Sequence, residues 1–165
     1  KLMPKVKENE LIYNIVMHHI SHYQQVKKIF KVDYDSHMII VVTYSHFLYQ
    51  TINSSLKKNY KDGLDWNEIF PTIRDLSSKV KKYNQKLSLF AVSHALDIPK
   101  ESVRRKVISL CKKKYLNYSI KDGLSIGVNF EETVKKLAPK DIAALKKVIN
   151  VVNDMGGVEK LSKFK

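Results

Sequence analysis

The sequence predicts a mainly helical protein, with a helical N-terminal region, a central pair of short helices followed by a β-hairpin, and C-terminal helices. Three observations lead to this expectation. Apolar residues recur at helical spacing along most of the chain, the residues 96–99 interrupt that pattern with an Asp-Ile-Pro break, and the period becomes alternating after Tyr115. We expect three segments, 1–85, 86–130 and 131–165, the first serving dimerisation or effector binding.

Two helices are expected in the N-terminal region. The first runs from Glu8 to Phe30. Its mostly apolar residues at helical spacing are expected to face inward, namely Ile12, Ile15, Val16, His19, Tyr23, Val26 and Phe30. The second follows Asp33 or Asp35 as a helix cap and keeps its helical period to Leu56. Residues 38–44 are apolar on nearly every side, so we expect them to be buried all round or to form the contact with another subunit. A buried strand is the competing interpretation of residues 38–44.

Further helices are expected on both sides of the central segment. A capping box at Asp65 and Glu68 predicts a helix over residues 66–83, which Pro71 would kink or restart. Beyond the central segment, helical patterns cover residues 131–136 and 141–153, and a last short helix is expected after Gly156-Gly157.

The central segment reads as helix, turn, helix and hairpin. Residues 89–96 form the first short helix, and Pro99 prevents its continuation. The second helix would bury Val103, Val107, Leu110 and Cys111, which leaves a polar and basic outer side. Alternating apolar residues then flank Asp122-Gly123, a dipeptide that favours a type I′ hairpin turn.

The positive charge of the chain is concentrated in this segment. Residues 79–121 hold twelve Lys and Arg against two carboxylates, whereas each flank contributes only +2 to the net charge of +14. Such a focused excess neutralises a row of phosphates and releases their counterions. The chain has 27 lysines and three arginines, and two of these arginines, Arg104 and Arg105, are adjacent. Because arginine binds guanine or phosphate in bidentate fashion, the pair predicts specific contacts to nucleic acid.

Residues 96–107 resemble the helix-turn-helix of winged-helix transcription regulators, including the GntR and MarR types, over about 40 residues of the chain. A proline, Pro99, stands where that family commonly has a serine, and the flanks match neither type. The resemblance implies sequence-specific binding to double-stranded DNA by a homodimer, with residues 100–114 as the recognition helix in the major groove. It assigns these DNA-binding residues: Lys100, Glu101, Ser102, Arg104, Arg105, Lys106, Ser109, Lys112 and Lys121.

Two alternative functions remain open from the sequence. His18 and His22 have the i, i+4 spacing that places two imidazoles on one metal ion, and with His37 and His46 they are the candidates for a metal-binding protein or sensor, to which Asp33 and Asp35 could add carboxylates. The competing interpretation packs His19 into the core and leaves the other histidines on the surface, since neither an HExxH pattern nor a cysteine cluster accompanies them. The second alternative is a winged helix that binds RNA or protein.

Several function classes lack support in the sequence. With five glycines and neither a nucleophile elbow nor a phosphate-binding loop, we expect no enzymatic activity and no cofactor. Residues 38–44 are the longest strongly apolar stretch and are too short to cross a bilayer, so no membrane association is expected. The single cysteine, Cys111, cannot form an internal disulfide and would become reactive only if it were exposed beside its lysine neighbours. A cytoplasmic location is therefore expected; the sequence does not identify an effector.

Overall fold

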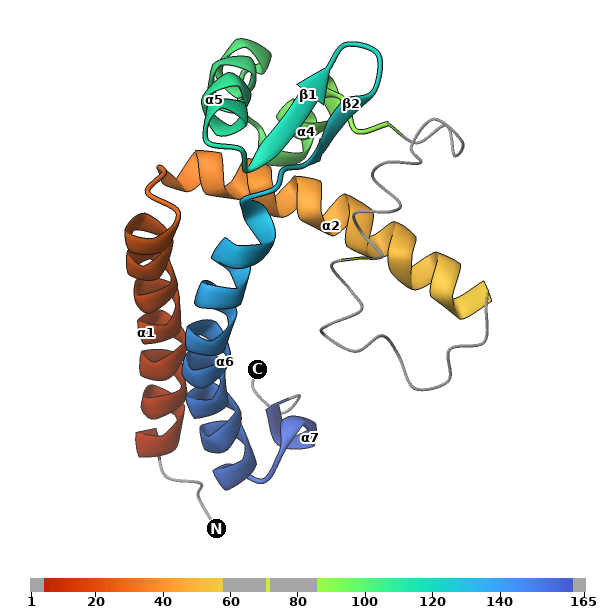
Figure 1. The fold of residues 1–165 in the computed structure, drawn as a ribbon. Coiled ribbons are helices and arrows are strands. Elements are labelled where there is room, and N and C mark those ends of the chain that lie inside the picture. The colour runs from red at the N-terminus through yellow and green to blue at the C-terminus, as the bar shows by residue number, and fades with distance from the viewer. Residues whose placement is uncertain (1–4, 58–70, 72–85, 162–165) are drawn as a thin grey trace. The chain divides into compact units, whose positions relative to one another are not determined.

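The computed structural model describes residues 5–57, 71 and 86–161, and this part of the chain is mainly helical with one small antiparallel hairpin (Figure 1). The expected helix over residues 66–83 lies, apart from Pro71, outside the described residues. The elements in chain order are α1 (Lys5–Ile29), α2 (Tyr34–Lys57), α4 (Leu89–Leu96), α5 (Lys100–Lys112), β1 (Leu116–Ser119), β2 (Gly123–Ile126), α6 (Phe130–Asp154) and α7 (Val158–Leu161).

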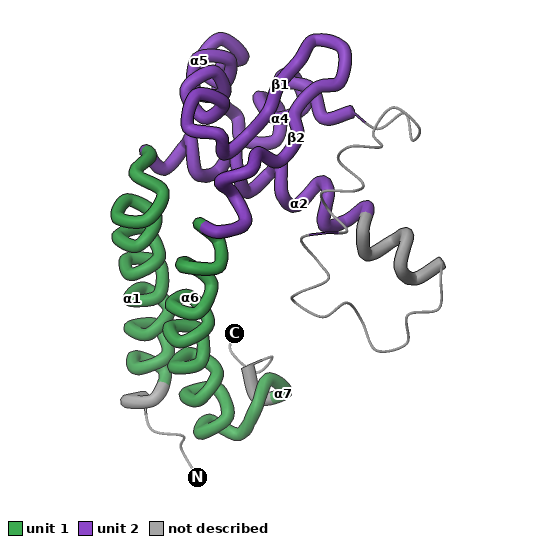
Figure 2. Tube along the Cα trace, in the orientation of Figure 1, with its two compact units in different colours: residues 1–32, 133–165 green, residues 33–132 purple. Residues whose placement is uncertain are grey.

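The chain divides into two compact units (Figure 2). Unit 1 combines residues 1–32 with residues 133–165, and unit 2 comprises residues 33–132. Unit 1 therefore joins the two ends of the chain, whereas the sequence suggests consecutive segments. The reason is that α1 and the greater part of α6 pack along each other. Such a contact between residues distant in sequence cannot be predicted from apolar spacing within one segment.

Helix α2 forms the centre of unit 2 and packs against α4, α5 and β2. Its start is set by Asp33, whose Oδ1 accepts a hydrogen bond from the backbone N–H of Ser36 at 2.9 Å, the contact of an N-cap residue. The core of unit 2 consists of buried apolar side chains from all of these elements: Ile39, Ile40, Phe47, Leu89, Val92, Val103, Val107, Leu110, Leu116 and Leu124.

Residues 38–44 lie within α2, so the helical interpretation is confirmed and the strand is excluded. Ile39, Ile40 and Thr43 are buried, and the residues between them are half-buried. The segment packs within its own chain, because α4, α5 and the hairpin lie against α2. Its contact with another subunit stays a prediction. A helix that is apolar on all sides is what a position at the centre of a unit requires.

The β-hairpin is confirmed, but its turn differs from the expected one. Leu116 pairs with Ile126 and Ser119 pairs with Gly123, so residues 120–122 form a three-residue loop in place of a two-residue turn at Asp122-Gly123. Ser119 Oγ closes the loop by accepting a hydrogen bond from Asp122 N at 2.9 Å. Gly123 is required here for another reason: at φ +76° its backbone runs so close to Leu87 that a Cβ atom would lie 2.5 Å from the Leu87 carbonyl oxygen.

Unit 1 is built on the pair α1 and α6, which run antiparallel (Figure 1). His22 Nδ1 lies 2.9 Å from Asp141 Oδ2, and Lys140 Nζ donates to Gln25 Oε1 at 3.1 Å. The two C-terminal helices expected over residues 131–136 and 141–153 are one continuous helix that passes through Pro139. Lys140 and Asp141, the two residues that follow Pro139, are the residues of α6 that form these contacts with α1.

The expected inner side of α1 is only partly correct. Val26 and Phe30 are buried, but Ile12, Val16 and Tyr23 are 60%, 49% and 47% exposed. The short helix after Gly156-Gly157 is confirmed as α7. Among the described helices, none combines the length and the apolar composition needed to cross a bilayer.

Candidate nucleic-acid interface

Helices α4 and α5 are joined by a tight turn whose residues determine where each helix ends. Ser88 caps α4, because its Oγ accepts a hydrogen bond from Ala91 N at 3.1 Å. Asp97 adopts the left-handed conformation with φ 52°, and Ile98 N then donates to Ser93 O. Pro99 is the residue before α5 and provides no side-chain cap, so α5 begins at Lys100.

The inner side of α5 is as the sequence predicts. Val103, Val107 and Leu110 are buried against the rest of unit 2, and Cys111 is half-buried. The opposite side of the helix is therefore turned outward. All candidate DNA-binding residues between positions 100 and 112 lie on α5, where Ser102 and Lys106 are half-buried and the others are exposed: Lys100, Glu101, Arg104, Arg105, Ser109 and Lys112. Lys121 is exposed in the loop of the hairpin.

Arg104 is paired with Glu101 one turn earlier on the same helix. Its Nε and Nη2 donate to the two carboxylate oxygens of Glu101 at 2.9 and 2.8 Å. The hydrogen bonds from Arg104 lower the pKa of Glu101, and the same hydrogen bonds raise the pKa of Arg104. Both side chains are exposed, so this pair orients the guanidinium along the helix surface and contributes little to stability.

Arg105 has a different environment from its neighbour. Its Nη2 lies 3.5 Å from Ser102 Oγ, which is at the limit of a hydrogen bond. Within the described part of the chain no carboxylate forms an ion pair with it. The Arg105 guanidinium therefore keeps its donors available for an external acceptor.

Lys106 is held by two carboxylates from the start of α2. Its Nζ lies 2.7 Å from Asp33 Oδ1 and 3.3 Å from Asp35 Oδ2, and its side chain is only 25% exposed. Asp33 thus caps α2 and binds α5 through one carboxylate. Lys106, which the sequence assigns to DNA contact, instead links the first turn of α2 to the middle of α5.

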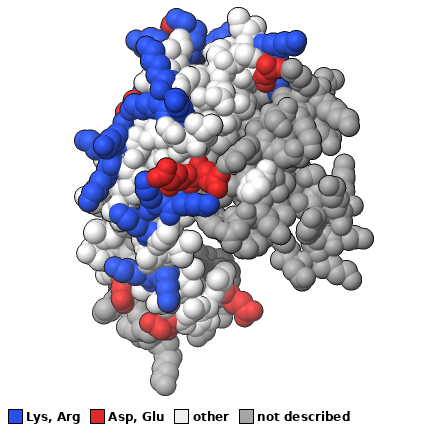
Figure 3. Space-filling view, viewed as in Figure 1, with Lys and Arg blue, Asp and Glu red and all other residues white. Residues whose placement is uncertain are grey.

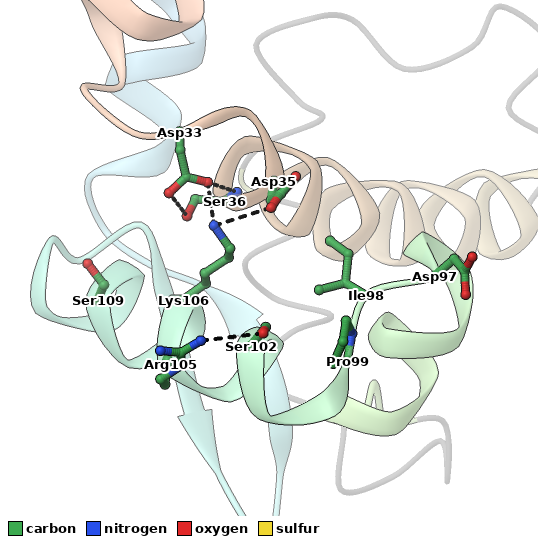
Figure 4. A pocket seen from close by; sticks show the side chains of 10 residues that line it. All are labelled: Asp33, Asp35, Ser36, Asp97, Ile98, Pro99, Ser102, Arg105, Lys106 and Ser109. Carbon is green, nitrogen blue, oxygen red and sulfur yellow. Dashed lines mark hydrogen bonds and ion pairs between the residues drawn. The ribbon is translucent and has the colours of Figure 1, made fainter.

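These groups border a polar pocket of about 510 Å³ between the start of α2 and the outer side of α5 (Figure 4). Figure 4 shows Lys106 pointing toward Asp33 and Asp35, while Arg105 lies beside Ser102. Asp97 and Pro99 line the pocket from the turn between α4 and α5. The cationic surface of α5 therefore has carboxylates along one edge.

The Asp33–Lys106 pair makes stability depend on pH. Partial burial acts to raise the pKa of Asp33, but the hydrogen bonds from Lys106 and Ser36 outweigh it, so the pKa lies below its ordinary value of 3.8. A lowered carboxylate pKa stabilises the fold above that ordinary value, and the stabilisation is lost as the pH falls through the folded-state pKa. Burial acts to lower the pKa of Lys106, but its hydrogen bonds to Asp33 and Asp35 outweigh that effect, so this pKa lies above 10.5.

We expect Asp33→Asn to reduce the free energy of unfolding at pH 7 by less than about 1 kcal/mol, because Asp33 is largely exposed and asparagine still caps a helix. The difference from the wild type should shrink as the pH is lowered from 7 to 3. Urea unfolding of both proteins across that range measures it. A difference that stays constant to pH 3 would show that the charge of Asp33 is not involved.

Sequence reasoning missed Asp33 and Asp35 as neighbours of the basic helix. From the sequence both are helix caps or metal-binding carboxylates, and 73 residues separate Asp33 from Lys106. Neither composition nor periodicity contains information on such a pairing.

The histidines do not gather into one site. His18 and His22 lie on α1 with ring centroids 6.5 Å apart, whereas His37 is buried in α2 and His46 contacts Gln50 farther along α2. His19 is exposed, contrary to the core position considered for it. Within residues 5–57, 71 and 86–161, no three histidine, cysteine or acidic side chains are grouped so that they could hold a metal ion.

Cys111 does not have the environment of a reactive thiol. Partial burial raises the pKa of its thiol, which opposes formation of the thiolate. The half-buried position agrees with the interpretation of Cys111 as a small apolar residue on the inner side of α5.

The chain was compared with models of protein families, with curated proteins and with solved structures, and none of the three comparisons found a match.

Proposed function

We propose that this protein is a transcriptional regulator that binds double-stranded DNA in a sequence-specific manner. In this proposal α4, the turn and α5 are the helix-turn-helix of a winged-helix domain, and β1 and β2 are its wing. Helix α5 enters the major groove, and the exposed Lys121 at the tip of the hairpin contacts the flanking backbone. The proposal includes neither catalysis nor a cofactor.

The observation that carries the proposal is the outer side of α5. Its inner side is fully engaged in the core of unit 2, and its outer side presents Arg105, which forms no ion pair with a carboxylate among the described residues. Figure 3 shows Lys and Arg side chains gathered over α5. An arginine of this kind can donate two hydrogen bonds to guanine O6 and N7, each such pair being worth about 1–3 kcal/mol of discrimination.

Because carboxylates lie beside part of α5, we assign two different roles to its cationic side chains, positioning of the helix and contact with phosphate. Asp33 and Asp35 neutralise Lys106 and would repel phosphates along their edge of the helix. We therefore assign Lys106 to positioning α5, and we assign phosphate contact to the exposed lysines at its two ends, Lys100 and Lys112. Arg104, oriented by Glu101, is a candidate for either backbone or base contact.

The hairpin is fixed well enough to act as a second contact. Lys86 Nζ donates to the carbonyl oxygen of Ile120 in the loop at 3.1 Å, and Leu124 N donates to Leu87 O at 2.9 Å. These hydrogen bonds connect the strands to the segment that precedes α4. A loop held in this way presents Lys121 at a defined place relative to α5.

The test compares two charge-removing variants of the full chain. Duplex fragments are first selected from random DNA with the purified protein, and binding is then measured over a range of salt concentrations. We expect Arg105→Ala to weaken binding to the selected duplex by about 10- to 100-fold and to relax the preference at one position. Lys112→Ala should weaken all duplexes alike and reduce the slope of log K against log salt by about one.

Equal effects of the two variants on all duplexes would contradict the roles assigned to Arg105 and Lys112. Competition with structured RNA at the same salt concentration addresses the remaining alternative. If RNA displaced the selected duplex at equal concentration, the proposal of a DNA-specific regulator would be wrong.

A further inference from the structure

The polar pocket between the start of α2 and the outer side of α5 has a charge pattern that DNA binding does not explain. Its volume of about 510 Å³ lies within the range of small-molecule sites. Three carboxylates line it against two cations, which gives a net charge of −1 in a chain whose net charge is +14. These charged residues are Asp33, Asp35, Asp97, Arg105 and Lys106. Because carboxylates repel phosphates, the pocket suits a smaller ligand that carries positive charge.

Only part of this charge is used within the chain. Asp33 and Lys106 bind each other at 2.7 Å. The Asp35 carboxylate is 54% exposed, and among the described residues Lys106 is its one ion-pair partner. Asp97 is exposed, and no described residue forms a hydrogen bond or an ion pair with its side chain. Asp35 and Asp97 therefore keep acceptors for a ligand, and Arg105 keeps donors.

The available groups lie at two ends of the pocket, with apolar side chains between them (Figure 4). Arg105 and Asp35 lie at one end, and Asp97 lies at the other end, beyond Ile98 and Pro99. Six residues separate Arg105 from Pro99, a rise of about 9 Å at helical spacing. A ligand that reaches both charged ends therefore needs a chain of several methylene groups across the apolar middle.

We propose that this pocket binds a basic α-amino acid with a side chain of lysine length. Its carboxylate accepts hydrogen bonds from Arg105, and its α-ammonium group donates to Asp35. The methylene groups pack on Ile98 and Pro99, and the ammonium group at the end of the side chain donates to Asp97. Two positive groups and one negative group give this ligand a net charge of +1, opposite to that of the pocket.

Arg105 belongs both to this pocket and to the side of α5 that is proposed to contact DNA. Its guanidinium cannot bind a ligand carboxylate and a guanine at the same time, so the amino acid and the duplex compete. By linkage, each then lowers the affinity for the other. This regulatory part rests on the proposed DNA binding, whereas binding of the amino acid does not and is measured without nucleic acid.

The first test titrates the isotope-labelled full chain with three probes and follows its amide NMR signals. L-lysine carries all three charged groups, L-norleucine lacks the ammonium group of the side chain, and pentane-1,5-diamine lacks the carboxylate. We expect lysine to bind with a Kd of about 1 mM or lower and to shift signals of residues 97–109. The other two probes should bind at least about tenfold more weakly. Equal binding of all three probes, or no binding of lysine at about 10 mM, would overturn the inference.

Two variants assign the ends of the ligand. Asp97→Asn should abolish the preference for lysine over norleucine, and Arg105→Ala should abolish the preference for lysine over the diamine. Asparagine tolerates the left-handed backbone at position 97, where φ is 52°, so the turn is kept. Arg104→Ala and Asp122→Asn are the matched controls, because both residues are exposed and neither lines the pocket. Retention of both preferences in the two pocket variants, or their loss in the controls, would overturn the site.

The second test measures the competition with DNA. Lysine at about ten times its Kd should weaken binding of the wild type to the selected duplex about tenfold, and norleucine at the same concentration and ionic strength should not. Duplex binding by Arg105→Ala should not respond to lysine. Unchanged duplex affinity in the presence of bound lysine would overturn the regulatory role. A protein that binds lysine but no duplex would support the amino-acid site and contradict the proposed function.

Discussion

Leu110→Ala is expected to lower the free energy of unfolding by about 2–5 kcal/mol. Leu110 is 1% exposed and lies with Val103 and Val107 on the side of α5 that packs into unit 2. The substitution removes buried apolar surface and leaves a cavity that α2 and the hairpin can fill only in part. Urea unfolding followed by circular dichroism measures the loss.

Ile108→Ala provides the control within the same helix. Ile108 is similar in size to Leu110, but it is 41% exposed, so its truncation should cost less than about 1 kcal/mol. Comparing the unfolding free energies of the two variants shows which side of α5 faces the core. If Ile108→Ala were the more costly change, the side of α5 that bears Arg105 would face the core, and the proposed DNA contact would lose its basis.

Gly127→Ala is expected to destabilise the protein by about 3 kcal/mol or more. A Cβ atom on Gly127 would lie 2.2 Å from the carbonyl oxygen of Lys114 and 2.7 Å from the carbonyl carbon of Tyr115. Both obstacles are backbone atoms, and Gly127 N donates to Tyr115 O at 2.8 Å, so neither segment can move without loss of a hydrogen bond. The measurement is again the unfolding free energy in urea.

Gly157→Ala is the control for Gly127→Ala, because it tests the cost of backbone strain without steric overlap. Gly157 has φ +90°, but a Cβ atom there would have no neighbouring atom within 4 Å, so only the conformational cost of about 1–2 kcal/mol applies. A near-neutral Gly127→Ala would show that the end of β2 does not approach the end of α5 as closely as described. The hairpin would then lack its fixed place beside α5.

Much of the fold was predictable from short-range patterns. The buried positions of α5 follow from the spacing of Val103, Val107 and Leu110, and α4 ends where Asp97 and Pro99 require it. Asp33 begins α2 because its side chain reaches the N–H groups of the next turn. These are interactions between residues close in sequence, so the sequence contains all the information they need.

The errors share a cause in contacts between distant residues. The hairpin loop is longer than expected because Leu87 pairs with Leu124 and uses Gly123 for close approach. Helix α6 continues past Pro139, and the residues directly after the proline contact α1, which is distant in sequence. Apolar spacing on α1 predicts an inner side, yet Ile12 and Val16 are exposed, because spacing alone does not reveal what lies opposite a helix.

By itself the sequence determined the helical class, the break before α5, the hairpin and the concentration of positive charge between residues 79 and 121. Each of these depends on propensity, periodicity or composition, which are properties of neighbouring residues. Only the tertiary structure decided that Lys106 is neutralised by Asp33 and Asp35, and that residues 38–44 pack against α4, α5 and the hairpin of their own chain. The physical reason is that ion pairing and burial depend on which surfaces meet, and chain folding brings those surfaces together across more than 70 residues.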